Sequence, residues 1–342
     1  MVDIGNVITF SFAWHKNMKF LKYFFLLLLL HLAFWIVFVL AFLAFFGEYL
    51  SLLFSNPDSL LQSLALDWSS SAFLYKIIFY ILTVFVISLL FLVFEVYVHA
   101  LIFLFAFQEK GFSTAPFGFN KVLGLIGLGI ISFFAALFYS FDESLRKWHW
   151  LSLAGLFFSI LLMLMLFFSP LLFVFGLLLF LPCFLFYLYF VLVNSLRMTA
   201  SMAIFLQEEK GVVESLKESF NLTKGHLIEI FVCNLAIAVI VGVVSSIFVF
   251  VFGSLLGFAL LPFLPPIQLP FNVPKNFVMT GLEPGGNTFN PSFFVGEQFA
   301  SLLFSPFSFL IGAFAAIGIY SELLKDREAA SMASSQKASV AK

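Results

Sequence analysis

Three ionisable side chains in apolar surroundings are the residues of this sequence best placed to do chemistry. Glu95 and His99 are four residues apart, so a helix would carry them on one face. The stretch 77–107 around them contains no other charged residue. Arg197 closes another long apolar stretch. Ionisable groups inside a membrane-spanning helix are costly and are candidates for function. We predict a Glu95–Arg197 ion pair near the cytoplasmic side, with His99 nearby. The alternatives are wet groups on protruding helix ends, or a transport or catalytic site.

No recognisable catalytic pattern accompanies these three residues. The sequence has no Gly-rich phosphate-binding loop, no H-E-x-x-H and no G-x-S-x-G. Its two cysteines, Cys183 and Cys233, are not spaced as metal ligands. The net charge of −1 gives no basic footprint for a nucleic acid. We therefore expect no cofactor, no metal, no nucleic-acid partner and no enzymatic activity.

The elements that must position these residues follow from composition. Of the 342 residues, 63% are hydrophobic and 10% charged, whereas soluble domains are about 25% charged. Only helices and closed barrels can cross a bilayer, and a helix needs about 20 apolar residues to do so. The apolar tracts do not alternate as barrel strands would. We predict an all-α, polytopic transmembrane bundle built from the uncharged tracts 23–47, 77–94, 122–141, 148–196, 230–274 and 298–321.

Basic residues then predict the number of crossings, because short cytoplasmic loops are rich in Lys and Arg. With the N-terminus, the loops 108–121 and 197–225 and the C-terminal tail inside, thirteen of the seventeen Lys and Arg residues are cytoplasmic. A double crossing by the tract 148–196, in addition to a crossing by 122–141, would leave six inside. We predict six crossings of the cell membrane and cytoplasmic termini. The surplus apolar length would form a re-entrant or half-membrane segment at 149–181.

An internal repeat supports an even number of crossings. Residues 108–113 read QEKGFS and residues 207–213 read QEEKGVV, each after a long apolar stretch. The pattern predicts three units near 3–107, 108–206 and 207–325, each with an amphipathic surface helix, a span outward and a span returning. The chain would then be one membrane domain, 1–325, with a disordered tail, 326–342.

The repeat also supplies a motif of turn and surface-helix residues. In 212–223, apolar side chains recur at helical spacing, as in a helix lying in the headgroup plane. Such a helix either guides the chain into the next span or presents a surface to lipid or a partner. The motif residues are Glu109, Lys110, Gly111, Glu209, Lys210, Gly211, Ser219, Lys224 and Gly225.

This motif resembles the membrane-domain family associated with glycerophosphodiester phosphodiesterases and its stand-alone relatives. That family shows an acidic-Gly turn and an "ALxxSxxLxxG" helix, which Ser215-Leu216, Ser219, Leu222 and Gly225 match, with Ser215 where Ala is usual. The opening SFAWHKN is similar to the family's first motif. The resemblance implies a six-helix membrane domain of undefined function. It does not imply phosphodiesterase activity, because the family's catalytic barrel is soluble and no segment here is polar enough to form one.

Three functions are therefore compatible with the sequence. A non-enzymatic membrane domain that associates with membrane lipids, or with a membrane-protein partner, fits the surface helices and the missing motifs. A transporter or lipid-moving protein fits the repeats and the charges in apolar helices. An intramembrane lipid-modifying enzyme would need clustered His, Asp or Glu at a cavity, for which Glu95 and His99 are the candidates.

Overall fold

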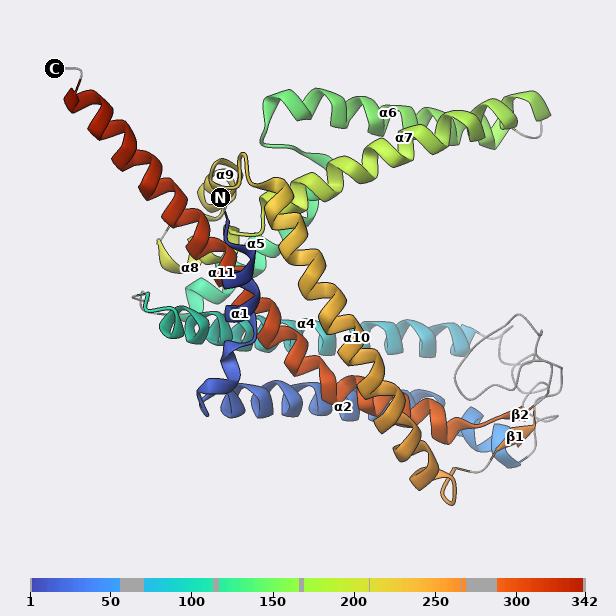
Figure 1. The fold of residues 1–342 in the computed structure, drawn as a ribbon. Helices are drawn as coiled ribbons and strands as arrows, with labels where there is room; N and C mark the ends of the chain where they lie inside the picture. Colours follow the sequence, from blue (N-terminus) through green and yellow to red (C-terminus); the bar gives the residue numbers. More distant parts are fainter. Residues whose placement is uncertain are drawn as a thin grey trace. The chain divides into compact units, whose positions relative to one another are not determined.

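The structure of this protein is a computed structural model, and it describes residues 2–55, 71–112, 117–165, 169–208, 210–264, 266–268 and 288–340 (Figure 1). Nearly all of these residues are helical, as the all-α prediction requires. A two-residue antiparallel pair, β1 with β2, precedes the last helix. The elements are α1 (Ile4–Ser11), the 3-10 turn η1 (Ala13–Lys16), α2 (Phe20–Ser55), α4 (Ser71–Glu109), α5 (Phe119–Phe138), α6 (Glu143–Leu164), α7 (Pro170–Arg197), α8 (Ser201–Gln207), α9 (Val212–Leu222), α10 (Leu227–Leu260), β1 (Ile267–Gln268), β2 (Thr288–Phe289) and α11 (Pro291–Val340).

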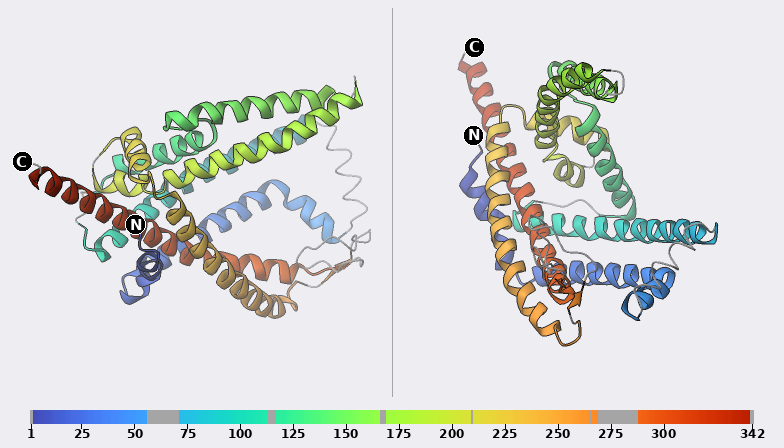
Figure 2. Two further views of the ribbon diagram at one scale, coloured as in Figure 1. Left: turned by 45° about the horizontal axis from the view of Figure 1, so that its top comes forward. Right: turned by 90° about the vertical axis from the view of Figure 1, so that its right-hand side faces the viewer.

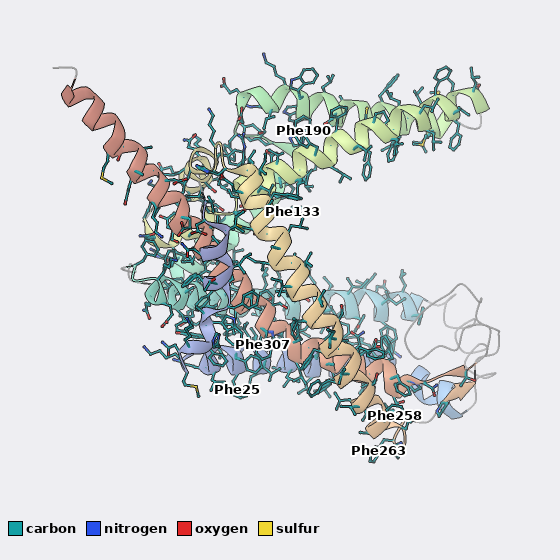
Figure 3. All side chains as sticks on the ribbon, viewed as in Figure 1. Phe25, Phe133, Phe190, Phe258, Phe263 and Phe307 are labelled. Carbon is teal, nitrogen blue, oxygen red and sulfur yellow. The ribbon has the colours of Figure 1, made fainter. Side chains whose placement is uncertain are left out.

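Seven of the described helices are long and apolar enough to cross a membrane. Their outer surfaces carry large apolar side chains, as Figure 3 shows for Phe25, Phe133 and Phe258, which are 53%, 60% and 63% exposed. Soluble proteins rarely expose so much apolar surface to water. The chain is therefore an integral, multi-spanning membrane protein, and lipid is the solvent of these helices.

The helices are organised in two compact units. Unit 1 comprises Met1–Lys16, Ile102–Ile240 and Ile311–Lys342, and unit 2 comprises Asn17–Leu101 and Val241–Leu310. Helices α4, α10 and α11 each begin in one unit and end in the other. Each unit is described by itself below.

In unit 1, α6 and α7 form a tight helical hairpin, visible side by side in all the views of Figures 1 and 2. Gly176 on α7 allows the close approach, because a methyl group there would lie 2.9 Å from the carbonyl oxygen of Ser159. The helices have 22 and 28 residues, so each is at least about 33 Å long. The segment predicted to be re-entrant or half-membrane, 149–181, thus lies in two arms long enough for full crossings.

The rest of unit 1 packs α5, α8 and α9 at one end of this hairpin. In the right-hand view of Figure 2 the hairpin is seen nearly end-on and α5 from the side, so α5 runs across the hairpin axis. The apolar face of α9 is buried in the protein at Leu216 and Phe220. Val213, expected on that face, is 45% exposed. Most of the face predicted to lie in the headgroups is therefore occupied by the protein itself.

The two ends of the chain also meet in unit 1. Phe10 of α1 packs on Phe314 of α11 with ring centroids 5.1 Å apart. The tail predicted to be disordered from residue 326 differs from the structure, in which α11 continues as helix to Val340. An ion pair explains part of this difference, because Arg327 in the first turn of the tail binds Glu218 at 2.9 Å.

Unit 2 holds its helices together through close backbone approach and aromatic packing. Gly253 and Gly257 on α10 face Gly296 on α11, where a methyl group on Gly296 would lie 2.7 Å from the backbone nitrogen of Gly257. Small residues at such a crossing let two membrane helices touch along their backbones. Phe24 of α2 packs on Phe307 of α11 with ring centroids 4.5 Å apart. Unit 2 thus joins α2 and α10 to the first part of α11.

Candidate functional site

Arg197 is placed at the end of α7 by contacts that all lie within unit 1. Its Nη1 donates to Oδ2 of Asp142 at 2.5 Å, and both side chains are largely buried. Its backbone carbonyl accepts hydrogen bonds from Oγ of Ser219 at 2.6 Å and Oγ1 of Thr223 at 3.4 Å. The guanidinium also lies over the ring of Phe220, 5.8 Å from its centroid. Arg197 therefore fastens α9 to the α6–α7 hairpin. The predicted pair with Glu95 would join the two units and stays a prediction.

Glu95 and His99 lie on one face of α4 in unit 2, as their spacing predicts. The ring of His99 packs on Phe309 at 4.2 Å, and His31 of α2 stacks on the same phenylalanine at 6.0 Å. Within the described residues, neither the Nδ1 of His31 nor the Nε2 of His99 has a hydrogen-bond partner. Glu95 and His31 line one pocket of about 310 Å³. The structure thus adds a second histidine to the predicted cluster.

The first repeat turn, with Glu109, Lys110 and Gly111, ends α4. Gly111 has φ of 84°, a left-handed conformation that favours glycine. The backbone nitrogen of Phe112 donates to the carbonyl of Phe107 at 3.0 Å, and that of Gly111 donates to Gln108 at 3.0 Å. This is a Schellman cap, completed by the Phe107–Phe112 ring contact at 5.7 Å. The need for a left-handed residue at this helix end therefore explains the glycine of this turn.

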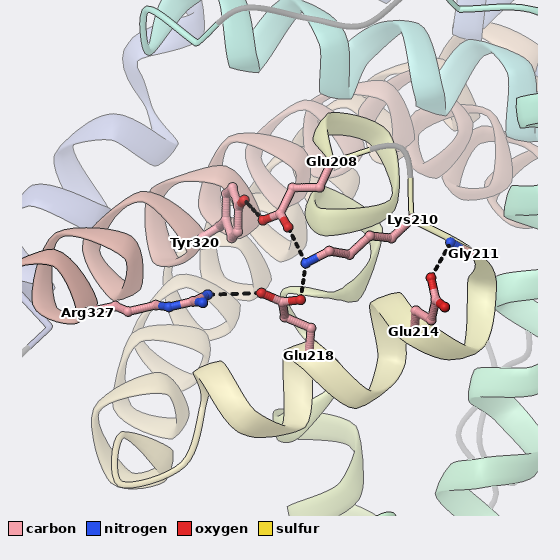
Figure 4. Close-up of polar contacts among 7 residues, drawn as sticks. All are labelled: Glu208, Lys210, Gly211, Glu214, Glu218, Tyr320 and Arg327. Carbon is pink, nitrogen blue, oxygen red and sulfur yellow. Dashed lines mark hydrogen bonds and ion pairs between the residues drawn. The ribbon is translucent and has the colours of Figure 1, made fainter. Parts of the chain in front are cut away.

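The second repeat turn builds a charged cluster, which we define as Glu208, Lys210, Glu218, Tyr320 and Arg327 (Figure 4). Lys210 pairs with Glu208 at 2.6 Å and also with Glu218. Arg327 binds the other oxygen of Glu218. Charges of opposite sign therefore alternate along the cluster, so each is compensated by a neighbour.

Gly211 lies at the start of a helix, whereas Gly111 lies at the end of one. Gly211 begins α9 in an extended conformation with φ of −65°, and its nitrogen donates to Glu214 at 3.3 Å (Figure 4). The aligned glycines thus cap opposite helix ends. Glu209, the remaining acidic residue of the predicted turn, lies outside the described residues.

Tyr320 of α11 is completely buried and touches both repeat turns. Its ring packs on Phe107 and Phe112 of the first turn, with centroids 6.2 and 6.1 Å away. Its hydroxyl donates to Oε1 of Glu208 in the second turn at 2.8 Å. Nothing in the sequence pattern singled out Tyr320, because it sits in an apolar span far from both turns.

The remaining motif residues belong to α9 and its end. Ser219 is buried and holds the carbonyl of Arg197, as described above. Gly225 has φ of 92° and makes the sharp turn from α9 into α10. Lys224 is exposed beside it. Ser219 and Gly225 therefore position helices, whereas the side chain of Lys224 is exposed.

The electrostatics of the charged cluster follow from its pairing. The hydrogen bond from Lys210 lowers the pKa of Glu218 below its ordinary value of 4.5, against a smaller opposing effect of burial. The hydrogen bonds to Glu208 and Glu218 raise the pKa of Lys210 above 10.5. Both groups are therefore ionised at neutral pH, and neither is poised to exchange a proton there.

A cleft of about 490 Å³ opens beside this cluster, lined by Glu218, His226, Asp326 and Arg327 among others. The Nδ1 of His226 lies 2.7 Å from Glu229, and its Nε2 lies 3.9 Å from Asp326. Across the described ranges, no group of three His, Cys, Asp or Glu side chains could hold a metal ion. The cleft residues are thus engaged with one another, and we assign no chemistry to them.

Unit 2 contains a second hollow, an apolar groove between α2 and α11 of about 520 Å³. Its lining is apolar apart from the amide of Gln298. Both helices are candidate membrane spans. Its lining includes Trp35, Val39, Leu40, Phe294, Phe299 and Leu302.

Sequence reasoning missed Asp142 as the partner of Arg197. Asp142 and Glu143 precede the basic residues Arg146 and Lys147 in the sequence, and Glu143 pairs with Arg146 at 3.7 Å. The available signal was that Asp142 lies directly after an apolar tract, at the level where Arg197 ends another.

Comparisons of this chain with protein-family models, with curated proteins and with solved structures find no match.

Proposed function

We propose that this protein is a non-enzymatic membrane domain that binds membrane lipid, crosses the cell membrane six times and keeps both termini in the cytoplasm. The observation that carries the lipid proposal is the apolar groove between α2 and α11 in unit 2. Its volume of about 520 Å³ lies within the range of small-molecule sites, about 300–1,000 Å³. A groove with such a lining on two spanning helices suits an acyl chain.

The topology rests on which segments meet in unit 1. The N-terminal helix, both repeat turns and the last part of α11 contact one another: Lys110 lies 4.4 Å from the ring centroid of Phe10, and Tyr320 binds Glu208. These are the segments whose basic residues predict a cytoplasmic location. Their contacts support placing both termini on one side.

The placement of α5 supports six crossings. The start of α5 and the segment directly after its end both meet the α8–α9 region, since Nζ of Lys121 donates to the carbonyl of Leu206 at 3.3 Å and Phe141 packs on Phe220 at 5.2 Å. We therefore assign α5 to the membrane surface and both arms of the α6–α7 hairpin to crossings. Arg146 and Lys147 then join the thirteen cytoplasmic basic residues, leaving Lys76 and Lys275 outside.

With this assignment the three repeat units have one plan. Each begins with a surface helix, α1, α5 or α9, and continues with two spans. The same plan is what the resemblance to the glycerophosphodiester phosphodiesterase membrane domain implies, and we keep that family as part of the proposal.

Native mass spectrometry of the purified protein tests lipid binding. We expect the wild type to retain phospholipid and Val39→Trp, which fills the groove, to lose it. Val244→Trp is the matched control, because Val244 is a similarly exposed valine on α10 of the same unit, 50% against 46%. Equal lipid retention in the two variants would refute the groove as the site.

Cysteine labelling tests the topology. In a chain whose Cys183 and Cys233 are replaced, Glu143→Cys is expected to react with a membrane-impermeant maleimide only after the cytoplasmic side is opened. Glu143 is suitable because its side chain is 92% exposed. Labelling from the outside of intact cells would show that α5 crosses the bilayer.

A further inference from the structure

The pocket shared by α2 and α4 differs from the apolar groove because it contains a carboxylate. It has a volume of about 310 Å³ and is entirely within unit 2. The residues that the argument uses are His31, Phe34 and Trp35 of α2, and Ser88, Phe91 and Glu95 of α4. We call this hollow the Glu95 pocket.

Helical spacing brings the polar groups of the Glu95 pocket together. Ser88 and Glu95 are seven residues apart on α4, two turns on one face. His31 and Trp35 are four apart on α2, one turn. Phe34 and Phe91 meet edge to face with centroids 5.1 Å apart and close a wall between the two helices. The pocket is thus an aromatic box with a carboxylate, a hydroxyl and an imidazole.

Glu95 makes no hydrogen bond or ion pair within the described part of the chain. Glu48 on α2, by contrast, forms a salt bridge. Its Oε2 lies 3.6 Å from Nζ of Lys76 on α4. Lys22 lies over Tyr23 instead, 6.0 Å from the ring centroid. An ionised carboxylate in an apolar span is costly unless a positive charge accompanies it. A cation from outside the chain would supply that charge.

The other walls define what kind of cation fits. Faces of Trp and Phe attract ammonium groups through their quadrupoles. The Nδ1 of His31 is buried and has no partner among the described residues, and in a neutral imidazole it can accept an N–H. Ser88 can accept another. A ligand with N–H donors beside an apolar group satisfies all of these walls.

From this geometry we infer that the Glu95 pocket binds a lipophilic primary amine in its protonated form. The ammonium donates to Glu95 and His31, and the apolar group packs on Trp35 and Phe91. This pocket shares Trp35 with the apolar groove, but its polar residues lie outside the groove and the inference does not depend on the proposed lipid binding. The pocket takes its ligand non-covalently, so no bond is made or broken.

Radiolabelled 2-phenylethylamine tests this inference on the full-length protein in phosphatidylcholine nanodiscs. We expect saturable binding by the wild type, and at least tenfold weaker binding by Glu95→Gln. Unlabelled 2-phenylethanol, which has the same ring but no charge, should not compete. Trp35→Leu should weaken binding about fivefold, the loss that corresponds to one cation–π contact.

Two controls keep the result interpretable. Glu48→Gln removes a carboxylate of the same unit outside the pocket and should bind as the wild type does. Leu92→Trp keeps Glu95 and fills the pocket from the same helix, so it should also abolish binding. This variant tests the pocket even if Glu95→Gln fails to fold. Undiminished binding by Glu95→Gln or Leu92→Trp, or competition by the alcohol, would overturn the inference.

A last arm separates a free amine from a lipid headgroup. The same measurement in nanodiscs containing phosphatidylethanolamine should give unchanged binding of 2-phenylethylamine. If that lipid displaces the probe from the wild type, the pocket belongs to the headgroup, and the inference of a free amine is overturned.

Discussion

The charged cluster of unit 1 and the Glu95 pocket of unit 2 place charge in opposite settings. In unit 1, Glu218 meets both Lys210 and Arg327, and Arg197 meets Asp142. In unit 2, Glu95 faces aromatic rings and a histidine nitrogen that has no partner in the described ranges. Paired charges fix the relative positions of helices, whereas an unpaired carboxylate beside a hollow is open to a ligand. Charge in an apolar protein therefore has a structural role in one unit and a binding role in the other.

The strongest test of this contrast removes one partner of the most buried pair. Arg197→Met removes the guanidinium that is bonded to the mostly buried carboxylate of Asp142, so we expect a loss of about 3–5 kcal/mol of stability. Arg146→Met is the control, since its partner Glu143 is 92% exposed and such pairs contribute about 0–1 kcal/mol. Thermal unfolding in detergent measures both. Similar melting temperatures for the two variants would show that the Arg197 pair is not structural.

A smaller loss is expected when the link between the two repeat turns is cut. Tyr320→Phe keeps the ring contacts and removes the hydrogen bond to Glu208, and hydrogen bonds to charged groups contribute about 1.5–3 kcal/mol. Tyr189→Phe serves as the control, because Tyr189 is 54% exposed on α7. Hydrogen exchange at the turn 207–211 should rise in Tyr320→Phe alone. Unchanged exchange there would contradict the bridging role.

The stability of unit 2 should depend on the volume of the side chains where its helices cross rather than on charge pairs. Gly296→Ala forces a methyl group against the backbone of α10, and overpacking of this kind costs about 1–3 kcal/mol. Gly242→Ala, on α10 with open space around it, should be neutral or slightly stabilising. Melting curves of the two variants compare them directly. A stable Gly296→Ala protein would mean that α10 and α11 do not touch at this point.

The smallest expected effect is on pH dependence. The pKa of Glu218 is lowered in the folded state, so its stabilising effect is present above 4.5 and is lost as the pH falls through the folded value. We expect at most about 1 kcal/mol, because the group is partly solvated. Glu218→Gln should flatten the acid side of the stability curve, whereas Glu214→Gln, whose carboxylate binds only a backbone nitrogen in the described contacts, should not. Identical acid profiles would refute the pairing.

Local sequence patterns correctly predicted features that depend on residues close together in the chain, such as helix ends and helical faces. Gly111 and Gly211 were predicted as turn residues, and both lie at helix ends, although they cap opposite ends. The spacing of Glu95 and His99 predicted one helical face, and the structure agrees. The hydrophobic positions of α9 predicted an apolar face lying in the headgroup plane, whereas the protein itself covers most of that face. Periodicity shows that a face is apolar and does not show which surface meets it.

The sequence by itself determined that this is a polytopic membrane protein of helices. Length and apolar composition are local properties, and lipid accepts any helix that satisfies its own backbone hydrogen bonds. Only the tertiary structure decided which polar groups meet: Asp142 with Arg197 across 55 residues, and Tyr320 with Glu208 across 112. Those contacts depend on how helices pack, and no spacing along the chain encodes a distance between residues so far apart.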